Sequence, residues 1–458
     1  MGGKRGVLGC SEKMKADIES AASKSDTSEA PYYVRGLALG LLAFLIGIHL
    51  WTWVFMLPTF VGGRADFRQL YAAGYMVRTG HASELYNYES QLHFQNQVVS
   101  HGDVPLPFIR PAYQALLFVP FSWLRYRTAY LVFLAVNVAL LGLCFRLLRP
   151  SMNRLAEVYW WLPAAMFLGY LPVAAALMQG QDSILLLALV LLAGVSLGRG
   201  RELTAGVLVG LGLFKPQLVL PIALLFFIWR RWRFAAGFAI SATLTGSLSI
   251  WLVGLAQTRT YARSLVTMGA SLAPRPDLLR YPIPVEAMAN LRGLIFGLVG
   301  GHFSAFWIQT ATIVLSGLAL GWVAASGFKK RGGRDALLLA ITTSSVVSYY
   351  LLIHDLTILL FPIAVTLNRF VGAEASGDKA GRRIARAAAL LLAAPVCFSY
   401  IPDHFYVVAL PLMVFLFAVL SASNQRLLAA SVGESTVSSP RPHVSRSRRI
   451  PTAPDLSF

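Results

Sequence analysis

Long apolar runs alternate with short polar segments through most of the chain. The first run covers residues 37–57, and twelve more follow at 112–124, 128–148, 157–177, 182–198, 203–214, 217–229, 234–256, 303–326, 335–352, 355–369, 386–401 and 405–423. A helix of about 20 apolar residues crosses a bilayer. The pattern therefore predicts an all-α, polytopic membrane domain over residues 31–423.

Polar segments flank this domain at both ends. Residues 1–30 and 424–458 have no apolar period, and the second segment is rich in Arg, Ser and Pro. Such composition is typical of disordered tails. The 36 residues before the first run are too long for a secretory leader, so we expect that run to be a permanent anchor.

Clusters of basic residues predict the orientation of the spans. Arg and Lys gather at 199–201, 230–233, 329–334 and 382–383, and the positive-inside rule places them in the cytoplasm. Counting spans back from the C-terminal tail leaves the run 112–124 without a crossing, as a re-entrant or interfacial piece. About twelve transmembrane helices and two cytoplasmic termini result.

The same count places the remaining loops outside the cell. They are 58–127, which includes two expected surface helices at 66–77 and 88–99, the loop 257–302, and the short turns at 179–182, 215–216, 354–355 and 402–403. The polar residues of these loops are the candidates for chemistry.

Composition supports a membrane protein and excludes a soluble one. The chain is 56% hydrophobic and only 13% charged, with a mean hydropathy of +0.60, whereas an average globular chain carries about 25% charged residues. The net charge of +19 does not indicate nucleic-acid binding, because the basic residues lie in short clusters beside apolar runs. Three cysteines give no disulfide framework.

Asp66 is the first outer residue that could carry chemistry. It follows Gly62-Gly63-Arg64-Ala65 and begins an expected helix, so it is either an N-cap or a general base held at the water–lipid boundary. Lys215 precedes Pro216 between apolar runs, and is either a snorkelling lysine or a cation for a phosphate group.

Two further polar turns interrupt the apolar pattern. Gln179, Gln181 and Asp182 share a turn that suits either a plain loop or the binding of sugar hydroxyls. His354 and Asp355 lie together at a run boundary, where ionisable side chains are often functional. No histidine pair has metal-ligand spacing and no DxD pair occurs, so we expect neither a catalytic metal nor a cofactor.

Several of these residues carry a resemblance to a known family. The residues that carry the resemblance are Ala65-Asp66-Phe67 with Tyr71 and Gly74, Glu84-Leu85-Tyr86, Arg110-Pro111 followed by 115–120, Gly180-Gln181, Lys215-Pro216 and the His354 segment that ends in Pro362. In order and spacing they resemble glycosyltransferase family 87, bacterial membrane enzymes of the GT-C superfamily. The resemblance covers about residues 37–423.

The resemblance implies an inner-membrane enzyme whose active site faces away from the cytoplasm. Its donor would be a polyprenyl monophosphate sugar, usually mannose and in some members arabinofuranose, and its acceptor a glycolipid or polysaccharide. Asp66 matches the family's base, and the sugar would be transferred with inversion and without a metal. We expect Lys215, His354 and Arg110 to bind the donor phosphate, and Gln179, Gln181, Asp182, Asp355, Tyr71 and Glu84 to bind sugar or acceptor.

Two other functions remain open at this point. A transporter or flippase for a lipid-linked sugar would carry ionisable residues near the middle of its spans, and little acid in the first loop. A ligase that uses a polyprenyl diphosphate oligosaccharide would need more arginines at the site, and the loop 257–302 holds five, Arg259, Arg263, Arg275, Arg280 and Arg292.

Overall fold

A computed structural model describes residues 32–103, 105–270, 285–326, 332–371 and 378–421. Within these ranges all regular structure is helical. The α-helices are α2 (Tyr32–Thr59), α3 (Phe67–Arg78), α4 (Tyr88–Val98), α5 (Tyr113–Phe118), α6 (Tyr126–Leu148), α7 (Asn153–Val158), α8 (Leu162–Gly169), α9 (Leu171–Met178), α10 (Ser183–Gly198), α11 (Glu202–Leu211), α12 (Pro216–Ile228), α13 (Trp232–Ala270), α14 (Leu291–Val299), α15 (Ala305–Ala325), α16 (Gly333–Val347), α17 (Leu360–Phe370) and α18 (Lys379–Ala393). A further helix covers residues 409–421. The two predicted tails lie outside the described residues.

Short 3₁₀ and π segments join these helices. They are η1 (Phe60–Arg64), η2 (Ala82–Glu84), η3 (Pro120–Trp123), η4 (Arg149–Ser151), η5 (Gly212–Phe214), η6 (Val285–Ala287), η8 (Ile353–Leu359), η9 (Ala394–Ser399) and η10 (Pro402–Val408). Two of them, η5 and η8, bring polar side chains to the ends of apolar helices.

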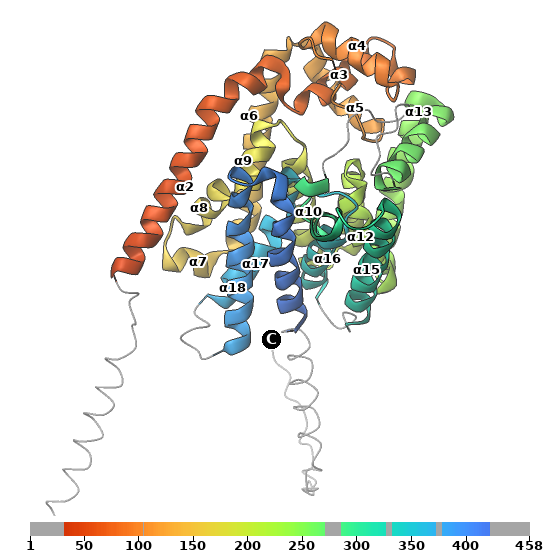
Figure 1. Cartoon of the computed structure of the whole chain (residues 1–458). Coiled ribbons are helices and arrows are strands. Elements are labelled where there is room, and N and C mark those ends of the chain that lie inside the picture. The colour runs from red at the N-terminus through yellow and green to blue at the C-terminus, as the bar shows by residue number, and fades with distance from the viewer. Residues whose placement is uncertain (1–31, 104, 271–284, 327–331, 372–377, 422–458) are drawn as a thin grey trace, which may run out of the picture.

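The first predicted loop forms a helical cap at one end of the bundle. Figure 1 shows α3, α4 and α5 together there, and α2 leaning away from the other helices. Helices α3 and α4 have nearly the predicted bounds. The run 112–124 folds as α5 and η3, which at 1.5 Å per residue are together too short to cross a bilayer.

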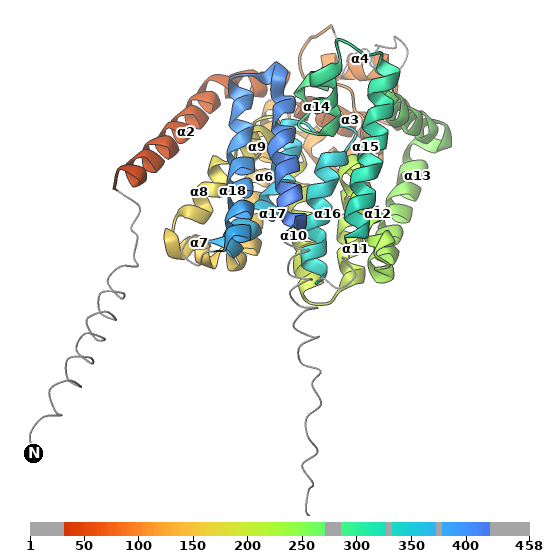
Figure 2. The same ribbon diagram turned by 60° about the horizontal axis from the view of Figure 1, so that its bottom comes forward.

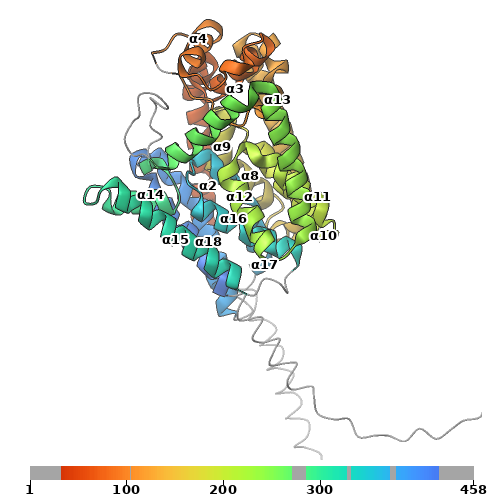
Figure 3. The same cartoon turned by 90° about the vertical axis from the view of Figure 1, so that its right-hand side faces the viewer.

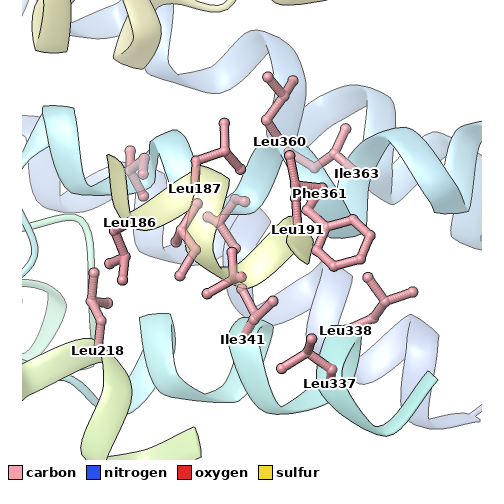
Figure 4. Packing of buried hydrophobic residues seen from close by; sticks show 14 of the residues in the cluster. Leu186, Leu187, Leu191, Leu218, Leu337, Leu338, Ile341, Leu360, Phe361 and Ile363 are labelled. Carbon is pink, nitrogen blue, oxygen red and sulfur yellow. The ribbon is translucent and has the colours of Figure 1, made fainter. Parts of the chain in front are cut away.

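The core of the bundle lies between α10, α12, α16 and α17. Leucines of α10 pack against Leu218 of α12, Leu337 and Ile341 of α16, and Phe361 of α17 (Figure 4). Glycine at position 194 permits this packing, because a Cβ there would meet the Phe361 ring at 2.7 Å. Helix α16 packs on α10 and on α17, and α17 in turn packs on α18 (Figure 2).

Six stretches of the described chain are long and apolar enough to cross a membrane. They are Ile46–Arg78, Tyr126–Ser151, Trp232–Leu265, Ala305–Ala325, Ile353–Phe370 and Pro402–Ser421. Shorter apolar helices, including α10 and α12, account for other predicted spans. The count of about twelve crossings stays a prediction.

The predicted apolar run 157–177 does not form one continuous helix. It begins at the end of α7 and continues through the short helices α8 and α9. Pro163 and Pro172 lie in the first turns of α8 and α9, where the missing proline N–H is tolerated, whereas inside a continuous helix each would remove a hydrogen bond.

The predicted outer loop also begins too early at residue 257. Helix α13 continues to Ala270, with a break at Gly254, whose φ is 78°. Figure 3 shows two arms of α13 that meet at an angle. The first arm packs on α11 and the second approaches η2 of the cap, so tertiary contacts stabilise a helix that the polar sequence alone did not indicate.

Candidate active site

Asp66 stands between η1 and α3, and its side chain does not cap the helix. The residue has helical angles, and its carboxylate makes no hydrogen bond to the first turn of α3. Instead, Asp66 Oδ2 accepts a hydrogen bond of 2.7 Å from Gln181 Nε2. The N-cap interpretation is therefore wrong, and the carboxylate is aimed at the turn between α9 and α10.

The start of α3 is fixed against that turn. The Phe67 amide donates to the Gln179 carbonyl oxygen at 2.9 Å. Gly180 has a φ of 60°, and a Cβ there would lie 2.7 Å from Phe67 Cβ. Only glycine accepts both the left-handed backbone and the close approach without strain. The position of Asp66 relative to Gln181 thus depends on backbone contacts.

Arg110 connects this pair to a buried group of charges. One guanidinium nitrogen lies 3.1 Å from Gln181 Oε1 and 3.5 Å from Asp182 Oδ1, while the other donates to the Phe214 carbonyl at 3.1 Å. Gln181 therefore accepts from Arg110 and donates to Asp66. The amide orientation of Gln181 is set by the charges on either side.

Lys215 is the deepest charged residue of the site, with no exposed surface. It precedes α12 because Pro216 occupies the first helical position. Its ammonium group donates to Ser183 Oγ at 2.8 Å and pairs with Asp182 Oδ1 at 3.2 Å. A third, close contact is with Asp355 Oδ1. These three partners match the three N–H donors of the ammonium group.

His354 and Asp355 enter the site from η8. Asp355 Oδ2 accepts from the Leu352 amide at 3.2 Å, so Asp355 anchors the start of this 3₁₀ segment as well as pairing with Lys215. His354 Nε2 lies 3.6 Å from Asp355 Oδ1. Its Nδ1 is buried and has no partner among the described residues.

The buried charges nearly cancel one another. Burial opposes the charged form of Asp182, but Arg110 and Lys215 outweigh burial and hold the pKa of the Asp182 carboxyl below its ordinary value. Burial likewise opposes the charge of Arg110, and Asp182 with other neighbours raises the Arg110 pKa above its ordinary value. Both residues therefore remain ionised at neutral pH.

The structure brings together seven of the residues that we singled out from the sequence: Asp66, Arg110, Gln181, Asp182, Lys215, His354 and Asp355. Gln179 adjoins them through its backbone, and its side-chain oxygen is buried without a partner among the described residues. Helices far apart in the sequence thus contribute to one site.

Two other predicted residues lie in the cap. The Tyr71 hydroxyl donates to the Leu124 carbonyl at 2.7 Å, and its ring contacts Phe67 and Tyr126. Glu84 accepts from Ser90 Oγ at 2.7 Å. Neither side chain makes a hydrogen bond, ion pair or ring contact with the seven residues above, so their part in sugar or acceptor binding stays a prediction.

Sequence reasoning missed Gln114 and Ser183. Gln114 Nε2 donates to Asp182 Oδ2, and Ser183 accepts from Lys215. Gln114 is the only amide in the run 112–124, which was a usable signal. Ser183 carried no such signal, because a single serine at the start of an apolar helix is ordinary.

The profile of Glycosyltransferase family 87 matches residues 108–354, more than half of the 458 residues. The chain belongs to this family. The family is one of glycosyltransferases, and the apolar helices make this member a membrane glycosyltransferase. The matched region includes Arg110, Lys215 and His354, whereas Asp66 lies before it and Asp355 one residue after it. No curated protein and no solved structure matches the chain.

Proposed function

We propose that the protein transfers a sugar, mannose in the first instance, from a polyprenyl monophosphate donor to an extracytoplasmic glycolipid or polysaccharide. The observation that carries the proposal is the half-buried carboxylate of Asp66, which a hydrogen bond from Gln181 holds beside a buried group of cations. Membership of a glycosyltransferase family supports it.

In the proposed reaction Asp66 is the general base. Gln181 donates a hydrogen bond to Asp66 Oδ2. Asp66 Oδ1 accepts no hydrogen bond from the described residues, so it is free to accept one from the acceptor hydroxyl. As the acceptor oxygen attacks the anomeric carbon from the face opposite the phosphate, its proton passes to Asp66. The bond from that carbon to the phosphate oxygen breaks, and polyprenyl phosphate leaves with the electron pair, so the sugar is transferred with inversion.

One carboxylate is enough for this chemistry. A phosphodiester donor releases a phosphate monoester, which is a stable anion and needs no proton from an acid, whereas glycosidases use a pair of carboxyl groups. Groups that hold the phosphate more strongly as its charge grows lower the barrier further. We assign this part to Arg110 and His354, which have buried nitrogens, Nε and Nδ1, without partners among the described residues.

The charge balance of the site sets a condition on donor binding. Among the described residues, Asp66, Asp182 and Asp355 face two permanent cations, Arg110 and Lys215, and Lys215 is already held by two carboxylates. The neutral imidazole of His354 could still donate one N–H to the phosphate, since its Nδ1 has no partner among the described residues. Lys215 would contact the phosphate only by giving up one of its carboxylates.

The apolar chain of the donor also has a place to lie. A cavity of about 470 Å³ opens between α12, α13 and α15, lined by Leu220, Pro221, Ala223, Leu224, Phe227, Ala235, Phe238 and Leu320. It begins about one helical turn after Lys215. We propose that the prenyl chain occupies this groove while its phosphate reaches the site.

A transporter of lipid-linked sugars fits the arrangement less well. Its function predicts ionisable residues near the middle of spans. Asp66, Asp182 and Lys215 instead immediately precede α3, α10 and α12. Residues at helix starts are held by the backbone, which suits the fixed geometry of a catalytic site.

Purified full-length protein, mixed with a membrane glycolipid extract, tests the proposal. We expect labelled mannose to move from polyprenyl-phosphate-mannose to the extract. Transfer only from the arabinofuranose donor would change the sugar, and transfer only from a diphosphate-linked donor would overturn the donor class. Movement of the donor across vesicles without any transfer would identify a transporter.

A further inference from the structure

A second group of buried polar atoms near Arg110 has no partners among the described residues. The group comprises Gln217 Oε1 and Nε2, the Tyr261 hydroxyl and the Tyr349 hydroxyl, in addition to Arg110 Nε and His354 Nδ1. Buried polar atoms without partners are uncommon in folded proteins, because each one destabilises the fold. Several at one place offer donors and acceptors to a bound polar molecule.

Tyr261 approaches Arg110 from the second arm of α13. Its ring stacks on Tyr86 with 5.2 Å between the ring centroids, and the Tyr86 hydroxyl donates to the Arg110 carbonyl oxygen at 2.8 Å. The break at Gly254 directs this arm toward the cap. The bend of α13 therefore has a consequence at the site, since it delivers a tyrosine there.

Tyr349 and Gln217 come from other segments, Tyr349 from the chain after α16 and Gln217 from the start of α12. Tyr349 lies edge-on to Tyr350, with 4.9 Å between the centroids, and Tyr350 is within electrostatic reach of Arg110, Asp182 and Asp355. Gln217 lies beside Tyr350, but its amide makes no hydrogen bond of normal geometry. Tyr261 and Tyr349 thus both lie within electrostatic reach of Arg110 and of each other, and Gln217 lies beside Tyr350, which also reaches Arg110.

The backbone that carries Tyr349 is held firmly. Asn290 Nδ2 donates to the Ser348 carbonyl at 2.7 Å, and Arg292 donates to the Tyr349 carbonyl at 3.0 Å. A preorganised hydroxyl loses little conformational entropy when a ligand binds. The Tyr349 hydroxyl, which has no partner among the described residues, therefore lies on a backbone segment that is held in place.

The chemistry of the group suits sugar hydroxyls. Two phenols and a primary amide are neutral and both donate and accept hydrogen bonds, whereas a phosphate would call for added cations. Aromatic rings also pack against the C–H faces of sugar rings. We propose that Gln217, Tyr261 and Tyr349 form a glycosyl subsite that binds the ring hydroxyls of a substrate sugar.

This inference rests on the proposed transferase function and names the side chains that recognise the sugar. The sugar is that of the donor or that of the acceptor, and both present the same hydroxyl chemistry. Hydrogen bonds run from Arg110 through Gln181 to Asp66, so these two side chains separate the proposed subsite from the proposed base.

Tyr261→Phe and Tyr349→Phe test the subsite because each removes only a hydroxyl. We expect the dissociation constant for polyprenyl-phosphate-mannose, or the KM for a glycolipid extract, to rise about 5- to 10-fold, the effect of one neutral hydrogen bond. A rise in the dissociation constant for the donor identifies a donor subsite, and a rise in the KM for the extract identifies an acceptor subsite. The melting temperature should stay equal or rise, because an unpaired buried hydroxyl is removed.

Tyr126→Phe is the matched control. Its hydroxyl donates to the Phe60 carbonyl at 3.3 Å in the cap, so we expect it to lower the melting temperature slightly without affecting either constant. Wild-type constants in both tyrosine variants, with transfer activity intact, would overturn the subsite alone. Absence of transfer in the wild type would overturn the proposed function, and unchanged donor binding in the variants would then overturn the subsite as well.

Discussion

At the scale of single residues, Lys215 is the most constrained side chain of the site. It is fully buried and makes polar contacts with Ser183, Asp182 and Asp355. Removing one partner from a buried ion group leaves charges without compensation, which is more unfavourable than the group itself is favourable. Lys215 therefore stabilises the fold as well as ordering the carboxylates around it.

Lys215→Met is expected to lower the free energy of unfolding by about 3–5 kcal/mol. Two carboxylates that now share one ammonium group would be left buried without it. Thermal unfolding of the purified protein in detergent measures the effect. Lys379→Met, at an exposed position of α18, is the control and should shift stability by less than about 0.5 kcal/mol. Equal melting temperatures for the two variants would contradict the buried ion group.

The sequence indicated which residues matter better than it indicated how they pair. Asp66, Lys215 and His354 stood out because ionisable residues are rare in so apolar a chain and lie at the ends of runs. Their partners could not be derived, since Lys215 and Asp355 are 140 positions apart and a single sequence holds no record of such contacts. Tyr71 shows the same limit, because an aromatic residue suits a core and a sugar site equally.

At the scale of elements, the approach of α3 to α5 places the cap. A Cβ at Gly74 would lie 2.5 Å from the carbonyl carbon and oxygen of Phe118. Backbone atoms cannot move aside as a flexible side chain does, so α3 can lie here only with glycine at this position. Because Asp66 directly precedes α3, the same contact sets the position of the proposed base.

Gly74→Ala is expected to lower both the rate of sugar transfer and the stability. The added methyl group would push α3 away from α5, and a displacement near 1 Å at a catalytic group is enough for a loss of about 100-fold. Gly142→Ala in α6 has open space around its Cβ and should be neutral or slightly stabilising. If both variants kept wild-type turnover, the cap would not position Asp66.

Helix boundaries were predictable where the apolar periodicity and the helix-breaking residues indicated the same limits. Helices α4, α10 and α12 begin and end close to their predicted limits. The extension of α13 beyond residue 256 was not predictable, because its second arm is polar and gains its stability from the cap. The prolines between α7 and α9 indicated a broken segment. The apolar composition of 157–177 nevertheless favoured the prediction of a single span.

At the scale of the whole molecule, the cap and the clusters of basic residues predict an orientation. Asp66, Gln181, Lys215 and His354 meet near the cap. Arg199 and Arg201 lie beyond the opposite end of α10 from Asp182. The positive-inside rule then predicts that the cap and the site lie outside the cytoplasm.

Labelling of single cysteines tests this orientation. In a chain without its three native cysteines, we expect Ser83→Cys, exposed in η2, to react with a membrane-impermeant maleimide in intact cells. Arg199→Cys, exposed after α10, should react only after the cells are opened. The reverse pattern would place the site in the cytoplasm and contradict an extracytoplasmic acceptor.

The most direct test compares Asp66→Asn with the wild type in transfer from polyprenyl-phosphate-mannose. The amide keeps the shape of the carboxylate but cannot accept the proton, so the account predicts a rate at least about 100-fold lower with donor binding unchanged within about twofold. A variant that retains more than about a tenth of the wild-type rate, a loss below roughly 1.4 kcal/mol, would contradict the assignment of Asp66 as the base.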